Sequence, residues 1–210
     1  MNRDAAALVV RARIALMQGH PEDAGKYIDE AIPKAVSPDA MLFKTGLLLT
    51  MGQRQAALDL SNKVLEKFPG NLQGRYARIE AYIALSQDDK AKAEVDDILA
   101  KTPNNYMAVY DRAVLLARAG NVNEAWRVAQ SLPGEFRDSV PRVALMVAQI
   151  AAKAGNDQTG ASILGRLLLK DPGSIPARIN LAAFHLGRNN PDEALKVLNP
   201  VKDSQDVQLR

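Results

Sequence analysis

Residues 144–167 read ALMVAQIAAKAGNDQTGASILGRL, and this stretch decides the fold. From Ala144 to Ala151 the apolar residues recur three or four positions apart, which is the spacing of one face of an amphipathic α-helix. Gly155 interrupts the run, and an apolar face resumes after it and continues to Leu167. The stretch therefore predicts two helices joined by a tight turn.

The same pattern occurs six times along the chain. In each copy an apolar run ends at a turn residue, and a small residue follows five positions later. The turn residues are Gly19, Gly52, Ser86, Gly120, Gly155 and Asn189, and the small residues are Ala24, Ala57, Ala91, Ala125, Gly160 and Ala194. Steps of 33, 34, 34, 35 and 34 residues separate the turns, so the chain is a repeat array built from one supersecondary unit. A small side chain is expected where the two helices of a unit approach most closely.

This period resembles the tetratricopeptide repeat (TPR), whose signature spans 34 residues. The columns of that signature hold Met41, Thr45, Leu48, Gly52, Ala57, Ser61, Val64 and Pro69 in the second repeat, and Ile79, Tyr82, Ala91, Val95, Ile98 and Pro103 in the third. The repeats are set at 5–38, 38–71, 72–105, 106–140, 141–174 and 175–208. The resemblance implies an all-α fold, an α-solenoid of six helix-turn-helix repeats that forms a right-handed superhelix with a concave groove.

Some positions depart from the family pattern. Trp126 is the one Trp of the chain, and it falls in the second helix of its repeat instead of the first signature column. Pro133 and Gly134 should end that helix early and leave a loop across 133–140, because proline cannot continue a helix. Proline shares one column in three other repeats, where it is expected to close the second helix: Pro69, Pro103 and Pro172.

Composition excludes several classes of protein. The sequence has no cysteine, so it can form neither a disulfide framework nor a thiolate metal site. The net charge is +3 and basic residues interleave with acidic ones, so nucleic acid is not an expected partner. Arg11 and Arg13 interrupt the apolar stretch Ala5–Met17, so neither a membrane span nor a signal segment is expected there. Direct membrane insertion is therefore not expected.

The ends of the sequence suggest a section of a longer repeat protein. Met1 leads straight into the first repeat, and the polar tail Lys202–Arg210 is too short for a full capping helix, which solenoids generally need. We therefore interpret 1–210 as a single solenoid taken from a longer chain. The compartment is not determined by the sequence, although the cell envelope is slightly favoured over the cytoplasm.

Residues that could carry chemistry are few. His20 is expected in a solvated turn, and His185 in a packing or capping position; neither has a second His or a Cys at metal-ligand spacing. Gly160 to Gly165 falls inside a predicted helix and not at a strand-to-helix elbow. We expect no enzyme activity, no cofactor and no metal.

The first helix of each repeat is the expected binding surface, since the resemblance places it on the concave side. The residues predicted to line this groove are Met17, Leu42, Leu49, Tyr76, Ile83, Met107, Tyr110, Val114, Arg142 and Leu145. Amphipathic aromatics with Met are typical of a protein or peptide site; the alternative is that these side chains pack within the array. The Lys/Asn clamp of chaperone-binding family members is absent from its columns.

A basic residue occupies one column in the first four repeats: Arg11, Lys44, Arg78 and Arg112. This basic ladder is either a track for an anionic polysaccharide or a set of long side chains whose stems cover apolar surface. Parts of the pattern also resemble, loosely, bacterial envelope TPR proteins of exopolysaccharide and PEP-CTERM (exosortase) systems. The sequence thus predicts a scaffold that binds a protein or peptide partner. The alternatives are an envelope component that contacts an anionic polysaccharide, and the repeat arm of a larger enzyme.

Overall fold

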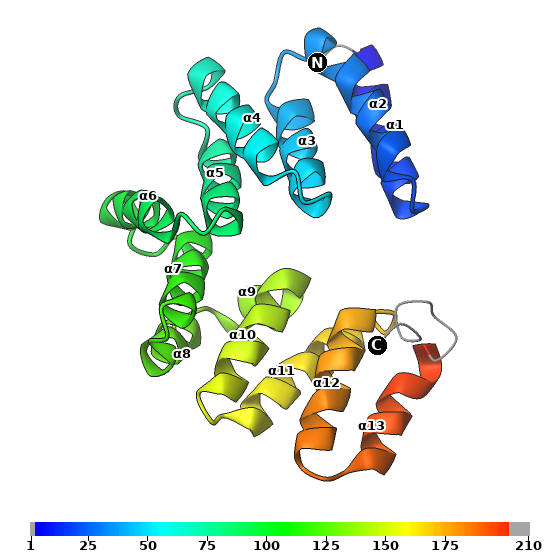
Figure 1. Ribbon diagram of the computed structural model, residues 1–210, viewed down its shortest axis with the longest axis vertical. Helices are drawn as coiled ribbons and strands as arrows, with labels where there is room; N and C mark the ends of the chain where they lie inside the picture. The colour runs from blue at the N-terminus through cyan, green and yellow to red at the C-terminus, as the bar shows by residue number, and fades with distance from the viewer. Residues whose placement is uncertain (1–2, 202–210) are drawn as a thin grey trace. The chain divides into compact units, whose positions relative to one another are not determined.

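The computed structural model describes residues 3–201, and over that range the chain contains thirteen α-helices, two short 3₁₀ helices and no strand. The prediction of an all-α fold is therefore confirmed (Figure 1). The predicted polar tail, Lys202–Arg210, lies outside the described residues. Within the described range, none of the helices combines the length and the apolar character needed to cross a membrane.

Twelve of the α-helices pair in chain order into six helix-turn-helix hairpins. The first three hairpins are α1 (Arg3–Met17) with α2 (Pro21–Ala31), α3 (Asp39–Thr50) with α4 (Arg54–Lys67), and α5 (Leu72–Ala84) with α6 (Asp88–Lys101). The last three are α7 (Tyr106–Arg118) with α8 (Val122–Gln130), α10 (Pro141–Lys153) with α11 (Asp157–Lys170), and α12 (Ile175–Gly187) with α13 (Pro191–Leu198). The short helices η1 (Ile32–Lys34) and η2 (Asn199–Val201) extend α2 and α13.

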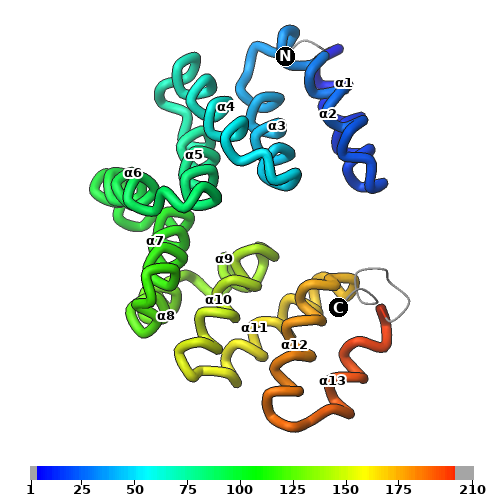
Figure 2. Tube along the Cα trace, viewed as in Figure 1, coloured from blue at the N-terminus to red at the C-terminus, as the bar shows by residue number. Residues whose placement is uncertain are grey.

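The chain divides into two compact units, Met1–Asp97 and Ile98–Arg210, and the boundary between them falls within α6. In the first unit α1 packs on α2, α3 on α4, and α4 on α5. In the second, α10, α11, α12 and α13 lie side by side in sequence order, as Figures 1 and 2 show. Within each unit, packing therefore runs between neighbours along the chain, as expected for a solenoid.

The turns of all six hairpins place one residue in the left-handed region of backbone space. Glycine fills this position in four repeats, where its φ lies between +73° and +82°. Ser86 and Asn189 adopt φ of +57° and +56° in the other two. A side chain at positive φ is sterically costly, so the turn geometry explains why glycine dominates the column that marked the repeat in the sequence.

The small residue after each turn is buried, as predicted. Five of the six members of this column are alanines with at most 2% of their surface exposed, and the sixth is Gly160 on α11, which is also buried. A Cβ on Gly160 would lie 2.8 Å from the carbonyl oxygen of Ala148 on α10. The two backbones are thus in contact at this crossing, and no larger residue fits there.

The prolines end the second helices as expected, but the fourth repeat differs from the prediction. Helix α8 does stop early, at Gln130, yet residues 134–139 form a short helix, α9 (Gly134–Ser139), instead of a loop. Pro133 cannot continue α8, but its carbonyl oxygen accepts a hydrogen bond from the Arg137 amide (2.9 Å) and so starts a new helix.

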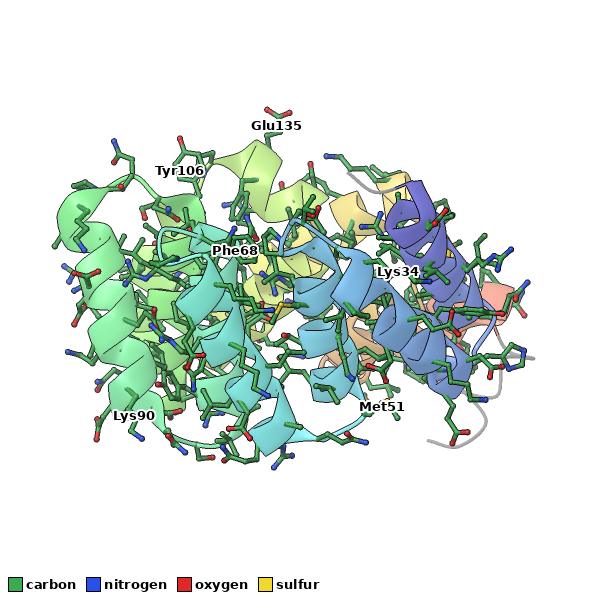
Figure 3. All side chains as sticks on the ribbon, turned by 90° about the horizontal axis from the view of Figure 1, so that it is seen from above. Lys34, Met51, Phe68, Lys90, Tyr106 and Glu135 are labelled. Carbon is green, nitrogen blue, oxygen red and sulfur yellow. The ribbon has the colours of Figure 1, made fainter. Side chains whose placement is uncertain are left out.

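Helix α9 is fastened to the rest of its unit by Asp138. This buried carboxylate accepts a hydrogen bond from Arg137 Nε (2.8 Å) and another from Arg166 Nε on α11 (2.6 Å). Burial opposes ionisation of Asp138, but the two guanidinium groups outweigh it and hold its pKa below the usual value. Tyr106 and Phe136 also contact each other, with ring centroids 5.8 Å apart. In Figure 3, Glu135 of α9 projects into solvent beyond these packed residues.

In the first unit a buried carboxylate fixes α6 against α5. Glu94 accepts hydrogen bonds from Arg75 Nε (3.0 Å) and from both Nε (2.9 Å) and Nη2 (2.8 Å) of Arg78. Arg75 also pairs with Asp97 (2.8 Å). The hydrogen bonds that Arg78 donates to Glu94 raise the pKa of Arg78 against the opposing effect of burial. Arg78 therefore has a structural partner within its own repeat.

Candidate functional site

In the second unit, the first helices of three consecutive repeats form one surface, because α10 contacts both α7 and α12. We name it the α7–α10–α12 face and define it by Met107, Tyr110, Arg142, Leu145, Gln149 and Asn180. At one end of it, the Arg142 guanidinium lies over the Tyr110 ring, 5.9 Å from the ring centroid. Arg142 Nη2 also approaches the Met107 sulfur at 3.6 Å. Three predicted groove residues, from two adjacent repeats, thus meet here.

The electrostatics of this end are shaped by burial. Burial, and secondarily the nearby Asp111 carboxylate, raise the pKa of Tyr110 to about 12, so its hydroxyl stays protonated. Desolvation lowers the pKa of Arg142, although a guanidinium remains charged at any physiological pH. Asp111 is 3% exposed, its Oδ2 has no hydrogen-bond partner, and burial raises its pKa to about 7.

At the other end of the face is a cleft of about 300 Å³ between α10, α11 and α12. Its walls are mostly small and apolar, and a few larger or polar residues complete the lining: Ala148, Gln149, Ala152, Asp157, Gly160, Ala161, Leu164, Asn180, Ala183, Phe184, Gly187 and Arg188. The cleft exists because small residues line this boundary between repeats and leave its space unfilled. Its volume lies at the lower end of the range of ligand-binding clefts.

A pair of side-chain amides borders the cleft. Gln149 Nε2 donates to Asn180 Oδ1 (3.2 Å), and Asn180 Nδ2 donates to the Pro176 carbonyl oxygen (2.8 Å). These bonds orient both amides, while the Gln149 carboxamide keeps an acceptor oxygen and a second N–H. Gln149 is exposed, so those groups are positioned to bond a peptide backbone.

The other predicted groove residues are placed individually. In the second unit Val114 is buried and Leu145 is half-buried. In the first unit Leu42, Leu49 and Ile83 are half-buried. Met17 is 87% exposed, whereas Tyr76 and Tyr110 are 7% and 8% exposed. The two tyrosines and Val114 therefore contribute chiefly to packing, and what they offer a partner is a small exposed edge.

The basic ladder is heterogeneous. Lys44 forms an ion pair with Asp29 of the preceding repeat, and Arg78 is held by Glu94. Arg11 and Arg112 are exposed. Arg11 lies beside His20, Asp23 and Tyr27 at a shallow surface hollow of about 210 Å³. At least two members of the ladder thus have carboxylate partners in the chain itself.

Three residues of the cleft, Asn180, Phe184 and Arg188, were not predicted from the sequence. Asn180 lies in a column that faces the preceding repeat, and the cleft becomes visible only when α10, α11 and α12 are packed. The sequence did contain one signal of the cleft, because Asn180 is polar whereas most repeats have an apolar residue in its column. Of the two histidines, His20 is exposed and His185 is half-buried beside Phe184, with ring centroids 5.4 Å apart. Residues 3–201 contain no cluster of three or more potential metal ligands.

Comparison with curated proteins finds a partial match. The chain is 32% identical over 99 residues to the FK506-binding protein-like protein of Homo sapiens, and 31% identical to that of Rattus norvegicus. The matched region is 43% of this chain and 28% of the length of either relative. The chain thus spans little more than a quarter of those proteins.

Comparison with solved structures finds the same fold. TTC0263 of Thermus thermophilus, a thermophilic TPR protein, has a TM-score of 0.73 at 17% identity, and the match covers 87% of this chain and 99% of that one. PilW, a type IV pilus biogenesis factor, has a TM-score of 0.67 at 14% identity, with 100% and 99% covered. YrrB, a TPR protein with an unusual peptide-binding site, has a TM-score of 0.55 at 18% identity, with 87% and 94% covered.

The repeat period, the six hairpins and these structural likenesses agree on one architecture. The tetratricopeptide repeat family model matches residues 48–110 and 151–208, which is more than half of the chain. The matched segments include helices from both compact units. The chain belongs to the tetratricopeptide repeat family.

Proposed function

We propose that this chain is a non-enzymatic scaffold that binds a peptide or protein segment on the α7–α10–α12 face. Proteins of the family bind protein or peptide partners, which supports the general role. The observation that carries the specific site is the cleft between α10, α11 and α12, together with the oriented Gln149–Asn180 amide pair at its border.

The bound segment follows from the chemistry of the face. An apolar side chain of the segment would enter the cleft, and its adjacent backbone would bond the free groups of the Gln149 amide. Arg142 and Arg188 lie toward the two ends of the face and favour an acidic residue beside the apolar one. We therefore infer an extended, acidic and apolar segment as the partner.

The polysaccharide alternative has weaker support. A track for a polyanion needs cations that are available to it, and Lys44 and Arg78 are already paired with carboxylates. The two proposals differ in their response to salt, because exposed charge attraction is screened within about 10 Å at 0.1 M ionic strength. If the chain retained an acidic glycan at low salt and released it at high salt, the polysaccharide proposal would be favoured.

The test is a selection of peptides from a random display library against the purified chain, at low and high salt. Selected peptides are then titrated against Ala183→Trp, which fills the cleft from an exposed position on α12, and against Gln149→Ala. We expect each variant to weaken binding by roughly tenfold or more, as for loss of a buried anchor or a backbone bond. Binding that is unchanged in both variants would rule out the α7–α10–α12 face.

The matched control is Leu169→Ala, since Leu169 is 83% exposed on α11 and lies outside the cleft. It should bind selected peptides as the wild type does. Substitution of Tyr76 or Tyr110 is a poor control, because both rings are buried and their loss would destabilise the repeats that carry them.

A further inference from the structure

Two exposed apolar faces lie on the first and last hairpins of the described chain. On α1, Val10 and Ile14 are 54% and 49% exposed. On α12 and α13, Leu186 and Leu195 are 58% and 66% exposed. An apolar face that the described repeats leave uncovered invites association. These two faces are apolar, and the repeat register shows what each is shaped to contact.

The outer face of α1 has the register of a helix that packs on a preceding hairpin. The residues 33 positions after Val10 and Ile14 are Phe43 and Leu47 of α3. Phe43 and Leu47 pack against the first hairpin, in a cluster with Ala12, Ala15, Ala24 and Ile28. Leu47 is 4% exposed, and Ala81, the next member of its column, is fully buried. Ile14 is the member of this column that no described hairpin covers.

The face of the last hairpin has the complementary register. Leu186 and Leu195 occupy the columns of Leu49 and Leu58 in the second repeat. Leu49 and Leu58 pack with Ala81 on the first helix of the following repeat. Leu58 is 7% exposed there, whereas Leu195 is 66% exposed. The last hairpin therefore presents the surface that receives a helix like α1.

Polar contacts across the internal boundaries follow the same register. Lys44 pairs with Asp29 of the preceding repeat, and Arg78 Nη1 donates to Asn62 Oδ1 of its preceding repeat (3.4 Å). Arg11 belongs to the column of Lys44 and Arg78. Asn199 belongs to the column of Asp29 and Asn62, and it is exposed. One hairpin supplies the donor and the other supplies the acceptor.

We propose that the chain self-associates head to tail, with α1 of one copy docked on the α12–α13 hairpin of a second copy. The contact continues the established packing of repeat on repeat: Val10 and Ile14 meet Leu186 and Leu195, and Arg11 donates to Asn199. Such a contact is heterologous, because the two surfaces differ, so it builds rings or open chains of copies instead of a closed pair. The proposal concerns the end hairpins and does not rest on the proposed peptide site.

Sedimentation velocity of the full chain over a range of concentrations tests the association. The wild type is expected to grow in mass with concentration. Ile14→Glu and Leu195→Glu should each weaken association by roughly 100-fold or more, since a charge would be buried without a partner. Leu169→Glu, at a position on α11 that is 83% exposed and belongs to neither face, should associate as the wild type does.

A mixture of the two variants separates head-to-tail contact from other geometries. Ile14→Glu keeps an intact last hairpin and Leu195→Glu keeps an intact α1, so the mixture should form a one-to-one heterodimer and nothing larger. A wild type that stays monomeric at every concentration would overturn the proposal. Self-association of the Leu195→Glu variant would also overturn the proposal, because the contact would then involve two copies of the α1 face.

Cross-linking tests the register, because the chain has no cysteine of its own. Single variants Arg11→Cys and Asn199→Cys, mixed and treated with a short bis-maleimide in place of the long arginine side chain, should form a cross-linked heterodimer faster than either forms a homodimer. The double variant Asp29→Cys/Lys44→Cys is the positive control within one chain, where the longer native side chains already touch. Equal rates of homodimer and heterodimer formation would contradict the register.

Discussion

At the scale of single residues, Asp111 is the group most at odds with its surroundings. Its carboxyl is buried without a hydrogen-bond partner at Oδ2, and burial raises its pKa from 3.8 to about 7. At a pH between these two pKa values, the Asp111 carboxyl is therefore protonated in the folded state and ionised in the unfolded state. The contribution of Asp111 to the free energy of unfolding is highest below about pH 4. It falls as the pH rises toward 7 and is constant above pH 7.

We predict that Asp111→Asn removes this pH dependence, because the amide is neutral and nearly isosteric. Relative to the wild type, the variant should gain about 2–3 kcal/mol of unfolding free energy between about pH 5 and pH 8. Denaturant unfolding at both pH values measures the gain. An equal difference at the two pH values would mean that Asp111 is not the titrating group.

Gly160 gives a second prediction at this scale. Gly160→Ala should destabilise the protein by about 1–3 kcal/mol, because the new Cβ meets the Ala148 carbonyl oxygen at 2.8 Å. Gly165→Ala on the same helix is the matched control, since its Cβ would meet nothing within 4 Å. That control should be neutral or stabilising by about 0.5–1 kcal/mol through helix propensity. Thermal unfolding of both variants gives the comparison.

The sequence predicted the burial of Gly160 but not that of Asp111. The burial of Gly160 followed from its column, because every repeat has a small residue there. The burial of Asp111 did not, since a charged residue on a helix is usually solvated and only the packed neighbours desolvate it. Tyr76 and Tyr110 likewise read as groove residues in sequence, because the pattern does not show how much of each ring its own neighbours cover.

At the scale of elements, helix α9 is held by long-range contacts, and the ion pair between Asp138 and Arg166 of α11 is one of them. We predict that Asp138→Ala destabilises α9 by about 1–3 kcal/mol, because it removes bonds from Arg137 and Arg166. Amide hydrogen exchange within residues 134–139 should accelerate, while α12 stays protected. The pKa of Asp138 is lowered by folding, so its contribution is present above pH 3.8 and is lost as the pH falls through the lower folded-state pKa. Unchanged exchange in α9 would show that packing alone holds it.

The α5–α6 contact gives another prediction. Glu94→Ala should cost about 3 kcal/mol, since it leaves Arg75 and Arg78 partly buried without this carboxylate. Lys92→Ala, which removes an exposed i,i+4 pair with Asp96 within the same helix, is the control and should change stability by less than about 0.5 kcal/mol. Chemical denaturation resolves the two. If Glu94→Ala lost no more unfolding free energy than the control, the contact of Glu94 with Arg75 and Arg78 would make no net contribution to stability.

Most elements followed from sequence, and the exception has a physical cause. Twelve helices were expected from apolar periodicity, turn residues and prolines, all of which are local signals. Helix α9 has six residues and no apolar period of its own, and its anchor, Arg166, is 28 residues from Asp138. The cleft was missed for the same reason, because it needs three helices that are adjacent only after folding.

At the scale of the whole molecule, the repeat period predicted the all-helical solenoid and the family, and the face proposed for binding came from the structure. Both proposed surfaces, the α7–α10–α12 face and the apolar faces of α1 and of the α12–α13 hairpin, are defined by what the described repeats leave uncovered. A repeat signature assigns each column of residues to a face of the repeat. It does not show which members of a column line a cleft and which are exposed to solvent.

The packing of each helix on its sequence neighbours also governs how the protein acquires its structure. Native contacts between residues close in sequence form quickly, because little chain entropy is lost before they stabilise the fold. During synthesis each hairpin can therefore fold as soon as it and the next one have left the ribosome, and no early repeat has to wait for the last.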